Sequence, residues 1–227
     1  MKQTFLAICA ATFFFAACNS DEKTADSKMD ESKKDSSSTM SSNDKMEEKK
    51  ADDTYTMPDT ATARKNWMAY STPGDVHKML AKSNGAWTSE ISMWEKPDGP
   101  VMKATGTMNN KMIMGGRYQV STFSGNMMGM PFEGMSTVAY DNARKIFIST
   151  WIDNMGTGLT TMEGTWDEGS KSLSSKGKMV DPTLGKELTT REVFKIIDDN
   201  TQTMEMYKPA PDGKEFKTME IKYTRKK

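Results

Sequence analysis

Residues 72–87, TPGDVHKMLAKSNGAW, contain the change from a helical pattern to a strand pattern in this chain. Residues 72–75 have the form of a helix start, with threonine as the N-cap, proline at the first helical position and an acid in the first turn. Apolar residues at helical spacing continue to Leu80, and the asparagine and glycine at 84–85 predict the end of the helix. Trp87 then lies inside the first predicted strand.

Turn signals recur at nine places after this point, separated by runs of about 7 to 12 residues rich in Thr, Val, Ile and aromatic residues. Nine turns without intervening helices predict about ten strands in an antiparallel up-and-down meander. We therefore expect a mainly β domain over residues 61–227, formed by a single antiparallel barrel with a short N-terminal helix. The turn signals are Pro97-Asp98-Gly99, Asn109-Asn110, Ser124-Gly125-Asn126, Asp141-Asn142, Asp153-Asn154, Asp167-Glu168-Gly169, Asp181-Pro182, Asp198-Asp199-Asn200 and Pro211-Asp212-Gly213.

The last predicted strands alternate between apolar and charged residues. Met219, Ile221 and Tyr223 share one face, and Glu220 and Lys222 take the other. A period of two is typical of a strand with one face turned to the protein interior.

Several short motifs spread over the domain form a combined pattern. They are His77-x-x-Leu80, Gly85-x-Trp87, Gly115-Gly116-Arg117, Pro131-Phe132-Glu133-Gly134, Tyr140-Asp141-Asn142, Ser149-Thr150-Trp151-Ile152-Asp153, Met162-Glu163-Gly164 and Met204-Glu205-Met206-Tyr207. This pattern, over about residues 75–225, resembles the DUF1579 family of uncharacterised bacterial proteins. The resemblance implies no established activity.

A short helix followed by Gly-x-Trp also resembles the start of a lipocalin or calycin barrel. In those barrels the tryptophan packs under an arginine near the end of the last strand. Trp87 and Arg225 occupy the matching places. The resemblance therefore implies a structural cation–π contact between them, of roughly 0.5–2 kcal/mol. The alternative fold is a β-sandwich.

Residues 1–18 have the form of a lipoprotein signal peptide. Residues 5–17 carry no charge, but as a helix they would rise only about 20 Å, which is too short to span a bilayer. Ala16-Ala17 before Cys18 resembles the lipobox of bacterial lipoproteins, in which the cysteine is acylated and becomes the new N-terminus. Phe15 departs from the usual leucine. The alternative is secretory cleavage that leaves Cys18 as a free thiol.

Residues 19–60 are predicted to be a disordered polar tether, because Ser, Lys, Asp and Glu cannot bury enough apolar surface to offset ordering entropy. Residues 63–70 predict one or two turns of helix.

We expect attachment to the bacterial cell envelope through lipid on Cys18, at the periplasmic or surface face of the outer membrane. Ser20-Asp21-Glu22 resembles a surface-export signal of some Gram-negative lipoproteins, and the alternative is that these are three more polar tether residues. No concentrated basic stretch suggests a nucleic-acid partner.

Few residues are available for catalysis in the mature domain. The two cysteines are Cys9 and Cys18, so a cysteine nucleophile or Cys-rich metal site is excluded. His77 is the single histidine and cannot form a multi-histidine zinc site. We interpret it as a packed polar residue at the barrel mouth, with a ligand or general base as the alternative. No nucleophile elbow, P-loop or dinucleotide motif is present, and we expect no cofactor.

Four residues are candidates for binding a small, partly apolar molecule in the barrel. Gly115-Gly116 predicts a kink or bulge that aims Arg117, which inside a barrel would hold a carboxylate or phosphate. Trp151 and Asp153 share a strand face, and Glu192 is the fourth candidate. The alternatives are a structural domain with a filled barrel, or a hydrolase or isomerase. Such an enzyme would use Asp153 and carboxylates among Glu133, Asp141, Glu163, Glu192 and Glu205.

Methionine is unusually frequent, with 22 residues against six leucines. The simplest interpretation is that methionine fills apolar positions that leucine usually takes. Met127, Met128 and Met130 cluster in a glycine-rich stretch, and thioethers bind Cu(I). Methionine is also frequent in the polar tether, where nothing packs. We therefore expect no metal site at Met127, Met128 and Met130.

Overall fold

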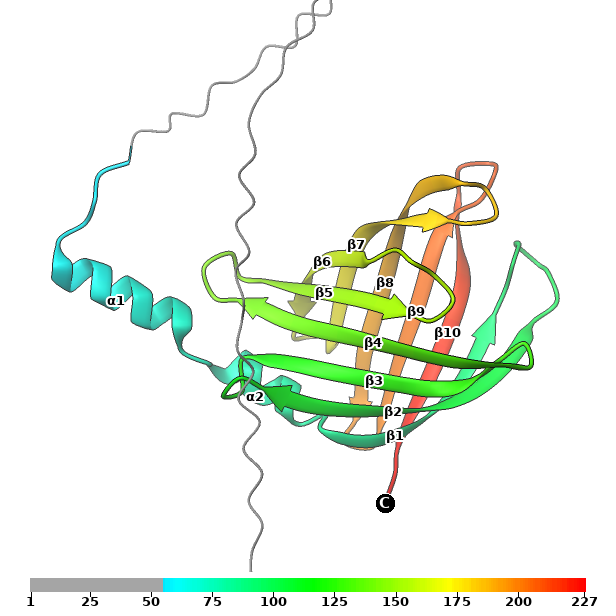
Figure 1. Ribbon diagram of the computed structural model, residues 1–227, viewed down its shortest axis with the longest axis horizontal. Coiled ribbons are helices and arrows are strands. Elements are labelled where there is room, and N and C mark those ends of the chain that lie inside the picture. The colour runs from blue at the N-terminus through cyan, green and yellow to red at the C-terminus, as the bar shows by residue number, and fades with distance from the viewer. Residues whose placement is uncertain (1–54) are drawn as a thin grey trace, which may run out of the picture. The chain divides into compact units, whose positions relative to one another are not determined.

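The computed structural model describes residues 55–227, within which ten antiparallel strands form a closed barrel (Figure 1). Each strand pairs with its sequence neighbours, and β1 (Gly85–Met93) pairs with β10 (Glu215–Arg225) to close the barrel. The predicted up-and-down barrel is therefore confirmed. The other strands are β2 (Met102–Ile113), β3 (Tyr118–Met127), β4 (Met130–Asp141), β5 (Ile146–Asp153), β6 (Thr160–Asp167), β7 (Ser172–Asp181), β8 (Lys186–Asp198) and β9 (Thr201–Pro209).

Two of the predicted turns are wrong, although the number of strands is right. Asn109-Asn110 lies within β2, and residues 124–126 lie within β3. The chain instead reverses at residues 114–116 and 128–129, where every residue has a positive φ. Glycine adopts this backbone without strain. The glycines therefore mark these two turns, whereas the Asn110 side chain is buried and bonded to a backbone carbonyl.

The hydrophobic core lies against one side of the barrel. Its buried members are Trp87, Ile91, Phe123, Met127, Phe132, Ile221 and Tyr223, from β1, β3, β4 and β10. The alternation predicted for the last strand is confirmed, because Ile221 and Tyr223 are buried and Lys222 is exposed. Many inward-facing side chains of β7–β9 remain partly accessible. These side chains point into a closed barrel and are still accessible to solvent. They therefore lie next to open space inside the barrel.

Two helices, α1 (Thr60–Ser71) and α2 (Asp75–Ala81), precede the barrel. α1 is longer than the one or two turns predicted. Thr72 caps the end of α1 and not the start of α2, because its hydroxyl donates to the Met68 carbonyl oxygen. α2 begins after Gly74, whose N–H donates to His77 Nδ1 at 3.1 Å. α2 contacts β2 and β3 at the end of the barrel where β1 begins.

α1 has no buried residue, and Trp67 keeps 67% of its surface exposed. Within residues 55–227, no helix combines the length and the apolar character needed to cross a bilayer. The predicted signal peptide, Cys18 and most of the predicted tether lie outside the described residues.

We expect a chain that starts at Met57 to be as stable as the mature chain. The tether offers few apolar residues to pack, and changes at such polar sites usually alter the free energy of unfolding by less than about 0.5 kcal/mol. Urea unfolding of the two chains, followed by circular dichroism, measures the difference. A cooperative loss of stability in the shorter chain would show that the tether packs on the barrel.

Candidate functional site

Trp87 and Arg225 close the end of the barrel next to α2. The Trp87 side chain is fully buried, and its ring N–H donates to the Ser83 carbonyl oxygen at 2.9 Å. Arg225 Cζ lies 4.2 Å from the centre of the Trp87 ring, which confirms the predicted contact. The guanidinium also donates to the carbonyl oxygens of Lys82 and Asn84, at 2.6 and 2.7 Å. Arg225 therefore joins the last strand to the turn after α2, a role that the sequence did not predict.

His77 packs at the same end of the barrel and is 5% exposed. Its ring centre lies 6.0 Å from that of Tyr140 in an edge-on arrangement. Burial, and then the positive charge of Arg117, lower the pKa of His77. The ring is therefore neutral at pH 7 and accepts the Gly74 N–H. These contacts support the interpretation of His77 as a packed polar residue.

Glu192 is the candidate binding residue that points into the barrel with no partner. The strand register places it opposite Ser175 on β7 and Met206 on β9, so the three side chains share the inward face. Burial alone raises the pKa of Glu192 to about 7, and within residues 55–227 no hydrogen bond or ion pair stabilises the carboxylate. The side chain nevertheless remains partly accessible. The carboxyl group is therefore surrounded by protein but borders space inside the barrel.

Three other buried polar atoms have no partner within the described part of the chain. They are Ser89 Oγ, Asn110 Oδ1 and Gln202 Oε1. Ser89 and Gln202 lie directly opposite Tyr223 in the sheet. Burial, and then the Glu192 carboxyl, raise the pKa of the Tyr223 hydroxyl, so these two side chains are within electrostatic reach. An unpartnered buried polar group costs about 1–3 kcal/mol, so each of these three atoms is a candidate for a bound water.

A row of methionines continues from Glu192 across the inner wall. Met206 lies opposite Met219, Met219 opposite Met93, and Met93 opposite Met102. Directly opposed side chains have Cβ atoms about 5 Å apart, so the four thioethers line one continuous strip. The sequence did not predict this methionine row, because only the register between strands brings the four residues together. The visible signals were Met206 in the Met204-Glu205-Met206-Tyr207 motif and Met219 on the apolar face of the last strand.

Trp151 and Asp153 share the inward face of β5, as their spacing predicts, but they bind each other. Trp151 Nε1 donates to Asp153 Oδ2 at 2.8 Å, and Asp153 Oδ1 accepts the backbone N–H groups of Met155 and Gly156. The Trp151 ring lies over Gly134, where a Cβ atom would approach it to 2.3 Å. The Asp153 carboxylate therefore stabilises the end of the strand, while Trp151 extends the core.

The predicted kink or bulge before Arg117 is wrong. Gly115-Gly116 do not form a bulge in a strand but the turn between β2 and β3. This turn directs Arg117 into solvent, where its guanidinium donates to the Met114 carbonyl oxygen at 3.1 Å. Arg117 is thus outside the barrel and cannot hold a ligand within it.

Most carboxylates of the enzymatic alternative lie away from the barrel interior. Glu163 forms an ion pair of 2.7 Å with Arg144 on the outer face, and Glu205 pairs with Lys217 at 2.9 Å. Asp141 accepts backbone N–H groups in the following turn, and Glu133 is exposed. Of this set, Asp153 and Glu192 point inward.

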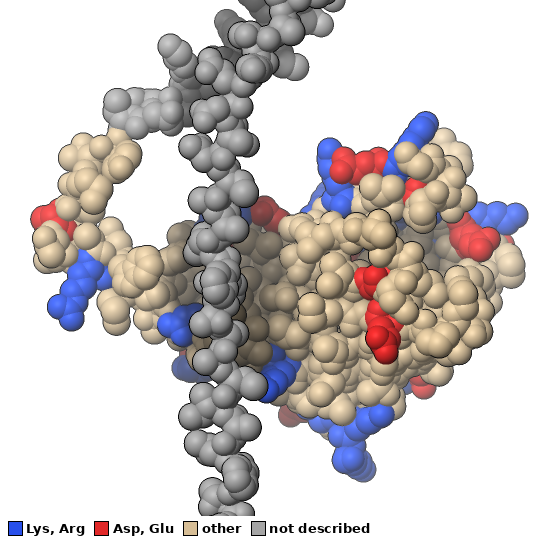
Figure 2. Space-filling view, in the orientation of Figure 1, with Lys and Arg blue, Asp and Glu red and all other residues tan. Residues whose placement is uncertain are grey.

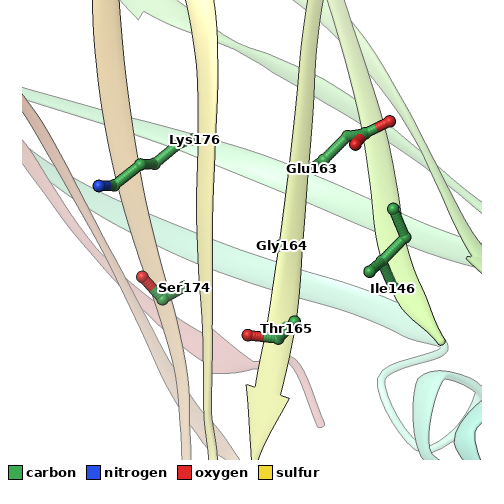
Figure 3. Close-up of a pocket in the computed structure, with 6 residues that line it drawn as sticks. All are labelled: Ile146, Glu163, Gly164, Thr165, Ser174 and Lys176. Atoms are coloured by element: carbon green, nitrogen blue, oxygen red, sulfur yellow. The ribbon is translucent and has the colours of Figure 1, made fainter. Parts of the chain in front are cut away.

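The outer surface has a shallow depression over β5–β7 (Figure 3). It is lined by Ile146, Glu163, Gly164, Thr165, Ser174 and Lys176. Its acid, Glu163, is already paired with Arg144. On the face of the barrel seen in Figure 2, charged side chains are sparse. Neither surface brings together groups that would act on a substrate.

Met127, Met128 and Met130 do not share one environment. Met127 is buried in the core, whereas Met128 is 66% and Met130 49% exposed. In residues 55–227, no three His, Cys, Asp or Glu residues are grouped where they would hold a metal ion. We continue to expect no tight Cu(I) binding by these three thioethers.

The closed barrel, the helix at one end and the inward carboxyl define a calycin-like antiparallel barrel with accessible interior surface. The profile of a family described as "Protein of unknown function (DUF1579)" matches residues 72–225. The chain belongs to the DUF1579 family.

Two solved structures are similar to this chain at low sequence identity. The crystal structure of Rv2717c from M. tuberculosis is 12% identical with a TM-score of 0.52, and the match covers 69% of this chain and all of that one. The S-type phycobiliprotein lyase CPES from Guillardia theta is 9% identical with a TM-score of 0.47, covering 67% of this chain and 93% of that one. A search of curated proteins finds no match. The likeness to Rv2717c supports the fold alone.

Proposed function

We propose that this protein is a lipid-anchored envelope lipoprotein that binds a small, partly apolar molecule inside its barrel without catalysis. The observation that carries the proposal is Glu192, a carboxyl group surrounded by protein, with no partner among residues 55–227 and bordering accessible space. A filled structural barrel would leave this group with an unrecovered desolvation cost. A ligand that bonds to it would recover part of that cost.

The enzymatic alternative has less support from the geometry. An acid and a base need two carboxyl groups that face one substrate. Asp153 is already bonded to Trp151 and to two backbone N–H groups. It would have to break these bonds to act beside Glu192, so non-catalytic binding is the simpler function.

Native mass spectrometry of protein purified from the bacterial envelope tests the proposal. We expect a retained small molecule on the wild-type domain that is reduced in Glu192→Gln. Glu187→Gln is the matched control, because Glu187 lies on the same strand but is exposed. A domain that carries no adduct and takes up no component of a mixed lipid extract would contradict the proposal.

The anchoring part of the proposal rests on Cys18. We expect Cys18→Ser to move the protein from the membrane fraction to the soluble envelope fraction, because lipid chains hold such proteins on the bilayer. Fractionation and labelling with radioactive palmitate measure this. A mutant that still sediments with membranes and still incorporates palmitate would overturn the lipobox interpretation.

A further inference from the structure

Within residues 55–227, the Glu192 carboxyl has no basic residue available to pair with it. On β9, Lys208 lies two residues beyond Met206, but it is held by Asp181 of β7 at 2.8 Å. Arg191, the neighbour of Glu192 on β8, is bonded to Glu215. The titratable group of β10 within reach is the Tyr223 hydroxyl, which is neutral at pH 7 as tyrosine ordinarily is, and burial raises its pKa further. The described part of the chain therefore supplies no counter-ion for the ionised Glu192 carboxylate.

Two of the other three unsatisfied atoms, the side-chain oxygens of Asn110 and Gln202, also require hydrogen-bond donors. The Asn110 and Gln202 side chains each use their amide N–H groups within the protein, and their oxygens are left without partners. An amide oxygen can only accept. A carboxylate ligand would bring further acceptors and a like charge next to Glu192, whereas an ammonium group supplies both charge and donors.

The methionine row defines what the rest of the ligand must be. Met206, Met219, Met93 and Met102 form an apolar strip that begins opposite Glu192. Thioether side chains are flexible and polarizable, so they adapt to hydrocarbon chains of various shapes. A molecule that contacts Glu192 and this strip together has one polar end and an apolar body.

We propose that the ligand is an amphipathic amine whose protonated nitrogen meets the Glu192 carboxylate and whose hydrocarbon part lies along the methionine row. This inference rests on the proposed binding function and names its ligand class. An ammonium–carboxylate contact in such a site is a charge-assisted hydrogen bond, which is stronger than a bond between neutral groups.

The test compares three probes with equal chains, decylamine, decanol and decanoate, by calorimetric titration below their micelle concentrations. At pH 8 we expect decylamine to bind about tenfold more tightly than decanol, and decanoate to bind least. Glu192→Gln should remove the preference for decylamine, so that decylamine and decanol bind this variant with similar affinity. Glu187→Gln should change none of the three affinities. Lowering the pH to 6 protonates Glu192 and should weaken decylamine binding by up to about tenfold.

The outcomes separate this inference from the proposed function. Equal binding of decylamine and decanol, or a decylamine preference that survives in Glu192→Gln, would overturn the amine class and leave barrel binding intact. Failure of all three probes to bind would contradict both. Circular dichroism of each variant confirms that a lost affinity does not reflect unfolding.

Discussion

Trp87→Ala should lower the free energy of unfolding by about 3–5 kcal/mol, in the range of large-to-small substitutions in protein cores. The Trp87 ring is fully buried, stacks under Arg225 and donates to the Ser83 carbonyl oxygen. Its loss leaves a cavity at the closed end and removes the partner of the guanidinium. Urea unfolding monitored by circular dichroism gives the difference.

Exposed Trp67 supplies the matched control, because Trp67→Ala removes the same side chain from a helix with no buried residue. It should change the stability by less than about 0.5 kcal/mol. Arg225→Ala should have an intermediate effect of about 2 kcal/mol, since it loses the ring contact and several bonds to carbonyl oxygens. If Trp87→Ala and Trp67→Ala were equally mild, the ring would not hold the barrel end together.

Glu192→Gln should stabilise the protein at pH 8 and have no effect at pH 4. Burial raises the pKa of this carboxyl from 4.5 to about 7, so the folded chain binds the proton more tightly than the unfolded chain. The protonated carboxyl therefore favours the folded state. This contribution to the free energy of unfolding is complete below pH 4.5 and is lost as the pH rises through 7. At pH 8 the buried charge costs up to about 3 kcal/mol, and less where water reaches the carboxyl. The neutral amide avoids this cost, so we expect a gain of about 2–3 kcal/mol.

Urea midpoints measured from pH 4 to pH 8 for wild type and Glu192→Gln test this dependence. Glu187→Gln, with its exposed side chain on the same strand, should follow the wild-type curve. Parallel curves for wild type and Glu192→Gln would mean that Glu192 titrates normally and is not desolvated.

The strand count and the closing pair could be predicted because they depend on local signals. Turn residues recur along the chain, and Trp87 and Arg225 must meet when first and last strands pair. The positions of two turns could not be predicted from local signals. At one of them, a tertiary hydrogen bond from the Asn110 side chain holds that residue within a strand. The same limit explains Arg117, whose direction depends on the conformation of a turn.

The interior wall depends on register, which the sequence does not display. Glu192 was predicted as a binding residue, but nothing in its neighbourhood along the chain showed that it would lack a partner. Its environment comes from β7, β9 and β10, whose residues are distant from it in sequence. For the same reason, the sequence showed that methionine is frequent but not that four methionines line one strip of the barrel wall.

The high methionine content allows a direct test of binding inside the barrel. Methyl-labelled methionine gives a separate NMR signal for each residue, and titration with decylamine shows which residues the probe contacts. We predict saturable shifts for Met93, Met206 and Met219 on the inner wall, and none for the exposed Met128 and Met155. Shifts confined to the exposed methionines, or no saturable shift at all, would contradict the account of a ligand-binding barrel.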